Sequence, residues 1–180
     1  KPINATVYDS ILVAQSNGHN KSYNLYSNVN YKYADTLGVS LNMDLDYGKY
    51  DSKKENYQPN TYYENDETTV LNENNSFQNT PVNIDITTFK TDYEQNFLKG
   101  KLGIGVKTSF VTTDNTLDFF DIVNDISTLN PNRSNQFIYK ENVNAGYLNY
   151  NRTYKKMNFQ FGLRVENTNS DGKLNALIAS

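Results

Sequence analysis

The sequence predicts an all-β fold, built as an antiparallel up-and-down meander of about seven to eight long strands. Three observations predict it: apolar and polar residues alternate along most of the 180 residues, aromatic residues reach 13% with 15 Tyr, and short turns alternate with long polar segments. A disordered chain would be poor in aromatic and β-branched residues. Only 37% of residues are hydrophobic, which is little for a core between two layers, so we expect a single-layer sheet.

The alternation is clearest in residues 157–168, MNFQFGLRVENT, where the odd positions up to Val165 are apolar and the even positions are polar. This period of two indicates a strand with one apolar and one polar face. In a soluble sheet the apolar face packs on a core, whereas in a membrane barrel it meets lipid and the polar face lines the lumen. Alternation alone leaves both interpretations open.

Further candidate strands precede this one along the chain. Residues 5–16 are the first, and 22–34 place Tyr and Leu opposite Asn and Lys. Residues 38–50 are regular, with Leu41 and Met43 opposite Asp44 and Asp46. The remaining candidates are 83–95, 100–113, 136–153 and 157–169. Most exceed the roughly five or six residues of an ordinary globular strand.

The connections favour a membrane barrel. Tight turns are predicted at 35–38, 97–100 and 154–156, and long polar segments lie between them at 51–82 and 114–135. Outer-membrane barrels have short periplasmic turns and long extracellular loops in this alternation. Tyrosines lie towards the predicted strand ends, where an interfacial girdle would place them, although Tyr is also a good strand residue. They are Tyr31, Tyr33, Tyr47, Tyr50, Tyr93, Tyr147, Tyr150 and Tyr154.

The composition excludes several classes of function. Without cysteine there is no disulfide or thiolate metal site, and the only histidine, His19, falls in a predicted polar turn, SNGHNKS. A net charge of −3 argues against nucleic-acid binding. No apolar run approaches 18 residues, so no transmembrane helix is expected. With no nucleophile–base pair and no metal cluster, we expect no enzyme activity and no cofactor.

Two groups of acidic residues are candidate sites. Asp44 and Asp46 share a strand face, and paired carboxylates act in glycoside hydrolysis, but lumen-facing polar residues are the interpretation we favour. Residues 114–135 read as a solvated loop, with Ca²⁺ binding as the alternative; the oxygen ligands would be Asp114, Asp118, Asp121 and Asp125. Apolar residues at helical spacing over 119–126 predict a short amphipathic helix there.

Four blocks of sequence, in this order, resemble one known family. They are ADTLGVSLNMDLDYGKYD (34–51), KLGIGVKTSFVTTDN (101–115), NPNRSNQFIYKENVNAGYLNY (130–150) and MNFQFGLRVENTNSDG (157–172). They resemble the C-terminal outer-membrane β-barrel region of TonB-dependent-receptor-like proteins of Gram-negative bacteria. The resemblance implies a barrel of about 22 strands, plugged by an N-terminal domain. It also implies uptake of metal chelates, glycans or peptides, driven by the TonB complex, and contact with outer-membrane lipid.

The resemblance covers the barrel region only. No plug domain is recognisable and the chain begins with Lys1, so we expect residues 1–180 to be a single barrel segment of a longer protein. Its polar segments would supply the contacts to a small nutrient ligand. The candidate contacts are Tyr57, Tyr62, Tyr63, Phe77, Phe119, Phe120 and Arg133.

The alternative function is a secreted β-sandwich that binds a glycan or surface polymer. It requires strands within both long polar segments, and 157–161 facing 39–43 across one core. For a barrel segment in isolation, two open sheet edges predict closure into a smaller barrel or sheet, or self-association.

Overall fold

The computed structural model describes residues 10–176, and the fold is all-β as predicted. The strands are β1 (Ile11–Ala14), β2 (Asn17–Ala34), β3 (Ser40–Gln58), β4 (Asn60–Tyr63), β5 (Val70–Glu73), β6 (Asn75–Phe97), β7 (Gly100–Val123), β8 (Ile126–Leu129), β9 (Asn135–Tyr154) and β10 (Met157–Ala176). Residues 5–9 of the candidate strand 5–16 lie outside the described residues, and Ile11–Ala14 within it form β1. Within the described range, no helix is long and apolar enough to cross a membrane.

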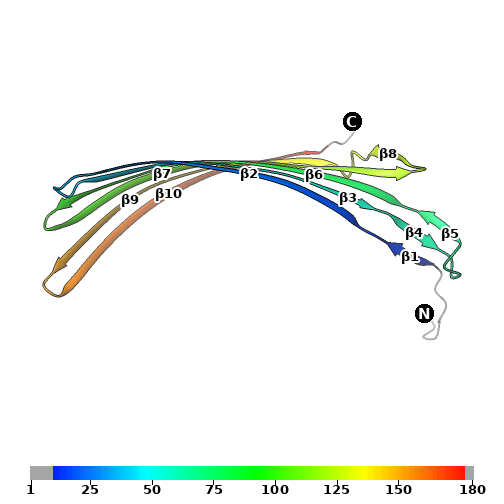
Figure 1. The fold of residues 1–180 in the computed structure, drawn as a ribbon, viewed down its shortest axis with the longest axis horizontal. Helices are drawn as coiled ribbons and strands as arrows, with labels where there is room; N and C mark the ends of the chain where they lie inside the picture. Colours follow the sequence, from blue (N-terminus) through cyan, green and yellow to red (C-terminus); the bar gives the residue numbers. More distant parts are fainter. Residues whose placement is uncertain (1–9, 177–180) are drawn as a thin grey trace.

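The main sheet is a single antiparallel meander. Its strand order is β10-β9-β7-β6-β3-β2, and β8 pairs with the far end of β7. The sheet bends into a long arc, with the short turns at one end and β4, β5 and β8 at the other (Figure 1). Six long strands and four short ones therefore take the place of the seven or eight long strands expected.

The long strands extend well beyond their predicted ends. Residues 51–82 and 114–135 were expected to be loops, and this expectation is wrong. The β3–β6 ladder continues to the pair of Gln58 with Ser76, and β7 continues to Val123. Backbone hydrogen bonds hold these extensions together, and both their faces carry polar side chains, so no apolar stripe reveals them in the sequence.

Two local predictions change with this extension. The helix expected over 119–126 is instead the end of β7, a turn at Asn124 and Asp125 with φ of 49° and 62°, and the start of β8. His19 lies within β2 opposite Glu55, not in a turn.

The three predicted short turns are confirmed. Leu98 and Lys99, with φ of 48° and 62°, connect β6 to β7; two left-handed residues match the twist of the flanking strands. The Asp35 carboxylate accepts hydrogen bonds from the backbone N–H groups of Leu37 (2.9 Å) and Val39 (2.8 Å) between β2 and β3. Lys155 and Lys156 join β9 to β10.

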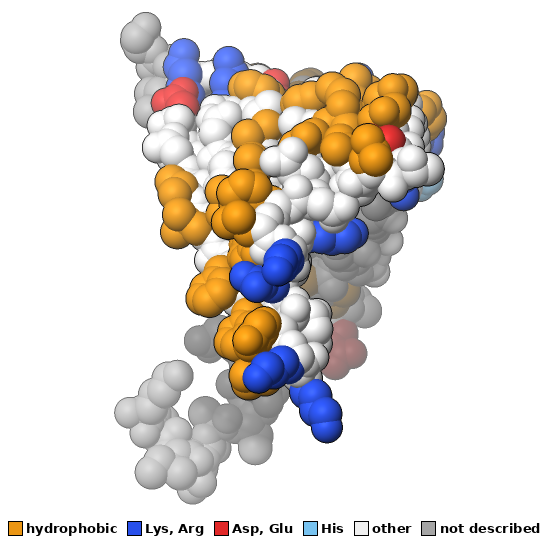
Figure 2. All heavy atoms as spheres, turned by 90° about the vertical axis from the view of Figure 1, so that its left-hand side faces the viewer, with side chains coloured by type: hydrophobic (Ala, Val, Ile, Leu, Met, Phe, Trp, Pro, Cys, Tyr) orange, Lys and Arg blue, Asp and Glu red, His pale blue; other side chains and the backbone are white. Residues whose placement is uncertain are grey.

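The strand register separates the side chains into two faces. Residues in register share a face, so Ile104 on β7 lies beside Leu148 on β9, which lies beside Leu163 on β10. One face, the apolar face, carries a band that begins near the short turns and spans 23–33, 41–47, 87–93, 102–110, 148–154 and 157–165. Three of these six segments have the roughly 9–11 residues of a membrane-crossing strand, and the other three are shorter. Figure 2, seen from the short-turn end, shows hydrophobic side chains gathered along one side of the sheet.

The band ends abruptly on the side away from the short turns. There the same face carries Lys49 and Asp51, whose charged groups lie 3.6 Å apart, and Asp85. The polar ends of the strands thus extend past the apolar band, as strands reaching beyond a membrane would.

No second layer covers the apolar band. Among the described residues only Phe119 and Ala145 are buried hydrophobic side chains, whereas Phe161 and Leu163 are 65% and 68% exposed. Leu41 shares the apolar face with Phe161, so the core that the sandwich alternative requires does not form. The strands it expected within the polar segments are present, but as extensions of one layer.

The sheet does not close. In the described part of the chain, β2 and β10 each have one neighbour in the main sheet, so two edges with unpaired backbone groups remain. Self-association of the isolated chain through these edges stays a prediction.

Candidate functional site: the polar face of the sheet

The polar face carries two groups of side-chain hydrogen bonds near the short turns, one around Asp44 and one around Asp46. The Asn30 amide donates to Asp44 at 2.6 Å, and Asn42 donates to the same carboxylate at 2.8 Å. Asp46 accepts from Tyr26 at 2.6 Å and Asn28 at 2.7 Å. Both carboxylates thus accept hydrogen bonds from neutral amide and phenol donors, in the arrangement expected of polar residues lining a lumen.

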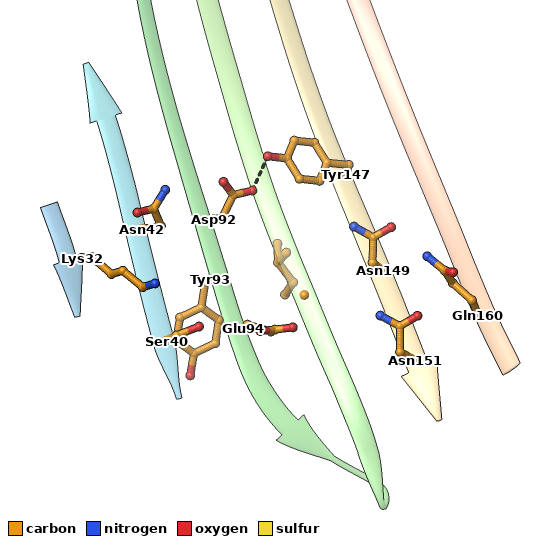
Figure 3. Close-up of a pocket in the computed structure, with 12 residues that line it drawn as sticks. Lys32, Ser40, Asn42, Asp92, Tyr93, Glu94, Tyr147, Asn149, Asn151 and Gln160 are labelled. Carbon is orange, nitrogen blue, oxygen red and sulfur yellow. Dashed lines mark hydrogen bonds between the residues drawn. The ribbon is translucent and has the colours of Figure 1, made fainter. Parts of the chain in front are cut away.

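Closer to the short turns the polar face is hollowed. The hollow has a volume of about 540 Å³ and is lined by Lys32, Ser40, Asn42, Asp92, Tyr93, Glu94, Gly103, Ile104, Tyr147, Asn149, Asn151 and Gln160. These residues come from all six long strands (Figure 3). Gly103 has no side chain to fill its centre, and a Cβ there would have only ordinary contacts, at 3.9 Å or more.

Tyr147 closes one side of the hollow. It pairs with Gly105, and its ring covers the space that a side chain at 105 would occupy. Its hydroxyl donates to the Asp92 carboxylate on β6 (Figure 3). Asp92 also pairs with Lys90, at 2.7 Å. The Tyr147 side chain thus reaches from β9 across β7 to an ion pair within β6.

The chemistry of this hollow is that of hydrogen bonding. Amides, two carboxylates and Lys32 surround it, and Lys101 lies 3.7 Å from Glu94. No cluster of three acidic or histidine side chains suited to a metal ion occurs within residues 10–176. Such a surface can hold a hydrated polar ligand or the polar surface of another domain.

Sequence reasoning missed the residues of the hollow. Alternation alone could have placed Asn149, Asn151 and Gln160 on a polar face, and Gly103 and Gly105 within one strand signal an open or closely packed spot. Their convergence with Asp92 and Lys32 depends on the register of the six strands, which the sequence does not show.

Three of the predicted ligand contacts come together at the far end of the sheet. Tyr57 pairs with Phe77, and Phe77 pairs with Phe120, with the two Phe ring centroids 5.9 Å apart. They lie on the face that carries the apolar band, beyond its end. Tyr62 and Tyr63 lie apart from them, on β4 in the small β1-β4-β5 sheet.

Phe119 is not available as a stacking surface. Because successive strand residues point to opposite faces, it lies on the polar face, opposite to Phe120. It is only 3% exposed, and the Arg133 guanidinium covers its ring at 3.4 Å. Its backbone N–H donates to the buried Ser134 hydroxyl at 2.9 Å, so Phe119 anchors the 130–134 connection. Arg133 also lies 3.9 Å from Asp121.

The four aspartates considered for Ca²⁺ do not converge. Asp114 accepts hydrogen bonds from Gln136, and Asp118 accepts one from Asn79. Asp121 lies on the opposite face of β7 and accepts from Asn130, while Asp125 lies in the turn that follows.

The tyrosine girdle also needs correction, because Tyr50 and Tyr147 fall on the polar face and cannot belong to a lipid-facing ring.

Hydrogen bonds shift the pKa of two ionisable groups beyond the apolar band. In the turn between β4 and β5, the side chain and backbone N–H of Thr69 and the N–H of Thr68 donate to Asp66, and they hold its pKa well below the usual range. The Tyr139 hydroxyl donates to Glu141 at 2.6 Å, which raises the tyrosine pKa.

A single-layer antiparallel meander, with one apolar band and one hydrogen-bonded polar face, is the wall of a membrane β-barrel. Residues 32–179 match the model of the outer membrane protein beta-barrel family, and the chain belongs to that family. No curated protein is similar enough to the chain to count as a relative. The protein is thus located in the bacterial outer membrane. In barrels of this kind the apolar face meets lipid, the polar face lines the lumen, and the short turns lie at the periplasmic end.

Proposed function

We propose that the chain is a wall segment of a TonB-dependent outer-membrane receptor, which takes up a metal chelate, a glycan or a peptide and is not an enzyme. In the full-length protein an N-terminal plug domain would fill the lumen, and the TonB complex would supply the energy. The observation that carries this proposal is the hollowed, hydrogen-bonding polar face on a sheet of six long strands whose edges are both open.

Barrel width supports the proposal. A barrel of about eight strands fills its interior with side chains, whereas one of about 22 strands encloses a lumen that a separate domain plugs. Here Gly103 and short amides line the lumen-facing hollow, and the ring of Tyr147 lies along the wall against Gly105. Such a wall suits a wide barrel whose interior is occupied by something other than its own side chains.

The far end of the sheet would meet the nutrient or a partner at the cell surface. Tyr57, Phe77 and Phe120 form an outward-facing row there, and Tyr62 and Tyr63 belong to the adjoining small sheet. We propose these five aromatic residues as candidate contacts. Phe119 is left out because it is buried.

The decisive experiment uses the full-length protein in its host. Uptake of a panel of ferric chelates, oligosaccharides and peptides is compared in wild-type cells, in cells that lack the protein and in cells that lack TonB. We expect at least one compound whose uptake requires both the protein and TonB. Uptake that depends on the protein but continues without TonB would identify a passive channel and overturn the proposal.

A pair of variants tests the role of the lumen. Gly103→Trp fills the hollow and should slow the TonB-dependent uptake, because a large ring there competes with the plug. Gly146→Trp is the matched control: position 146 lies on the lipid-facing side, with open space within 4 Å of a Cβ. Equal uptake by the two variants would mean that the hollow does not contact the plug.

A further inference from the structure

Arg152 is the single charged side chain of the lipid-facing band within the described residues. It lies on β9 opposite Phe159, two positions before the strand ends at Tyr154. No acidic side chain within the described residues forms an ion pair with it. Its guanidinium lies 5.8 Å from the centroid of the Tyr154 ring. A charge on a lipid-facing stripe is costly unless it reaches the interface or a partner.

The stagger of the hairpins gives Arg152 a recess to point into. Pairing between β7 and β9 ends at Lys101 with Asn151, so residues 152–154 have no partner on β7 and lie beside the β6–β7 turn. The step between the two hairpins is hollowed. Most of its lining comes from the polar face, including Lys101, and Arg152 and Phe159 of the apolar band and Lys99 of the turn complete it. Lys101 lies near Glu94, whereas Lys99 lies in the turn itself. Positive charge therefore collects at the periplasmic end of the wall.

A second hollow adjoins the first on the lipid-facing side. It is lined by Tyr150, Arg152, Tyr154, Phe159 and Phe161, and Arg152 and Phe159 line both hollows. Arg152 and Phe159 thus connect a basic recess at the short-turn end, which opens towards the polar face, to an aromatic groove on the apolar face. This order of polar and apolar surface matches the order of headgroup and acyl chain in one lipid molecule.

We propose that this surface binds one anionic phospholipid of the periplasmic leaflet. Its phosphate would contact Arg152 and Lys99, and an acyl chain would lie along Phe159 and Phe161. The planar guanidinium suits a phosphate because it can donate two parallel hydrogen bonds. The negative headgroup complements the recess, and the short turns place it in the periplasmic leaflet, where phospholipid is the anion within reach. The proposal is independent of the transport function.

The test uses full-length protein reconstituted into bilayers of phosphatidylethanolamine with a minor fraction of phosphatidylglycerol. Native mass spectrometry then counts the lipids that stay bound. We expect the wild type to retain phosphatidylglycerol in preference to phosphatidylethanolamine. Arg152→Gln should weaken retention about tenfold, the scale of losing a hydrogen bond between charged groups. Arg152→Lys should fall between the two, and Lys99→Gln should lose a few-fold without altering the lipid-facing stripe.

Lys140→Gln is the matched control, since Lys140 is on the same strand and face but beyond the apolar band. It should leave retention unchanged, and heat-modifiable gel migration should show that every variant is folded. Glycerol phosphate, which has the headgroup charge but no acyl chain, should not displace the lipid. Unchanged retention in Arg152→Gln, equal loss in Lys140→Gln, or full displacement by glycerol phosphate would each overturn the proposal.

Discussion

The ring of Tyr147 on β9 lies over Gly105, its partner on β7, and occupies the space that a side chain at 105 would need. The tyrosine hydroxyl continues across the sheet to the Asp92 carboxylate on β6. One side chain therefore crosses three strands of the lumen wall, and this is possible only because the middle strand has a glycine beneath it. The contact joins β6, β7 and β9 by side chains as well as by backbone hydrogen bonds.

The first prediction concerns that glycine. Gly105→Ala should destabilise the barrel by about 1–3 kcal/mol, the usual effect of forcing a group into an occupied space, because the added methyl must displace the Tyr147 ring. Denaturant unfolding of the full-length protein in detergent measures it. Gly103→Ala is the control on the same strand and face, where a Cβ has only ordinary contacts. Equal stability of the two variants would show that the Tyr147 ring moves aside freely.

The second prediction is a double-mutant cycle on the same pair. In a Tyr147→Ala background the space above residue 105 is empty, so Gly105→Ala should then have little effect on stability. The two substitutions should therefore be strongly non-additive, as contacting residues are. Additive losses would mean that the alanine at 105 acts through the strand backbone. Tyr147→Phe, which keeps the ring but not the hydroxyl, should retain the full penalty of Gly105→Ala.

Alternation and turn chemistry were sufficient to predict the centre of the wall. Leu41, Phe159 and Phe161 were placed on apolar faces because the period of two is unbroken there, and the three short turns were found from their length. The strand extensions were not found, because 51–58 and 114–123 carry polar residues on both faces and are held by pairing with neighbouring strands. These extensions form because each pairs in register with a neighbouring strand, and the sequence of one segment alone does not reveal that pairing.

In the candidate site, too, the sequence does not predict on which face of the sheet a single residue lies. Phe119 and Phe120 are adjacent and chemically identical, yet one is buried beneath Arg133 and the other continues an outward aromatic row. Which of the two is exposed depends on the strand face to which each belongs. The sequence predicts a helix over 119–126, so it assigns neither residue to a strand face. The sequence does not single out Asp92, because its pattern does not reveal the partner of Asp92, Tyr147.

The third prediction concerns the Asp66 turn and pH. Its hydrogen bonds favour the carboxylate and depress its pKa, so they stabilise the turn at every pH above the ordinary aspartate value of about 3.9. That contribution is lost only as the pH falls below this value towards the depressed pKa. Hydrogen-exchange protection of the Thr68 and Thr69 amides, corrected for intrinsic rate, should therefore be equal at pH 7 and pH 5.

Asp66→Ala is the matching variant for this turn. It should lower the protection of the same two amides several-fold at both pH values, because the acceptor is missing in each. The corresponding amides in the β6–β7 turn, Leu98 and Lys99, should not change. A wild-type protection that already falls between pH 7 and pH 5 would contradict the assignment of Asp66 as the acceptor.

The fourth prediction asks which face meets lipid. Leu163 lies on the apolar band, in register with Leu148 and Ile104, and is 68% exposed in the isolated sheet. Leu163→Arg should destabilise the membrane-inserted protein by about 2–4 kcal/mol, the scale for arginine on the lipid face near the bilayer midplane. Gln160→Arg, on the same strand but facing the lumen hollow, should have a much smaller effect, because that side chain stays in a polar environment. Folding into lipid vesicles, titrated with urea, compares the two. If both variants fold equally well, the apolar band is not the lipid contact; a larger loss for Gln160→Arg would mean that the two faces are assigned the wrong way round.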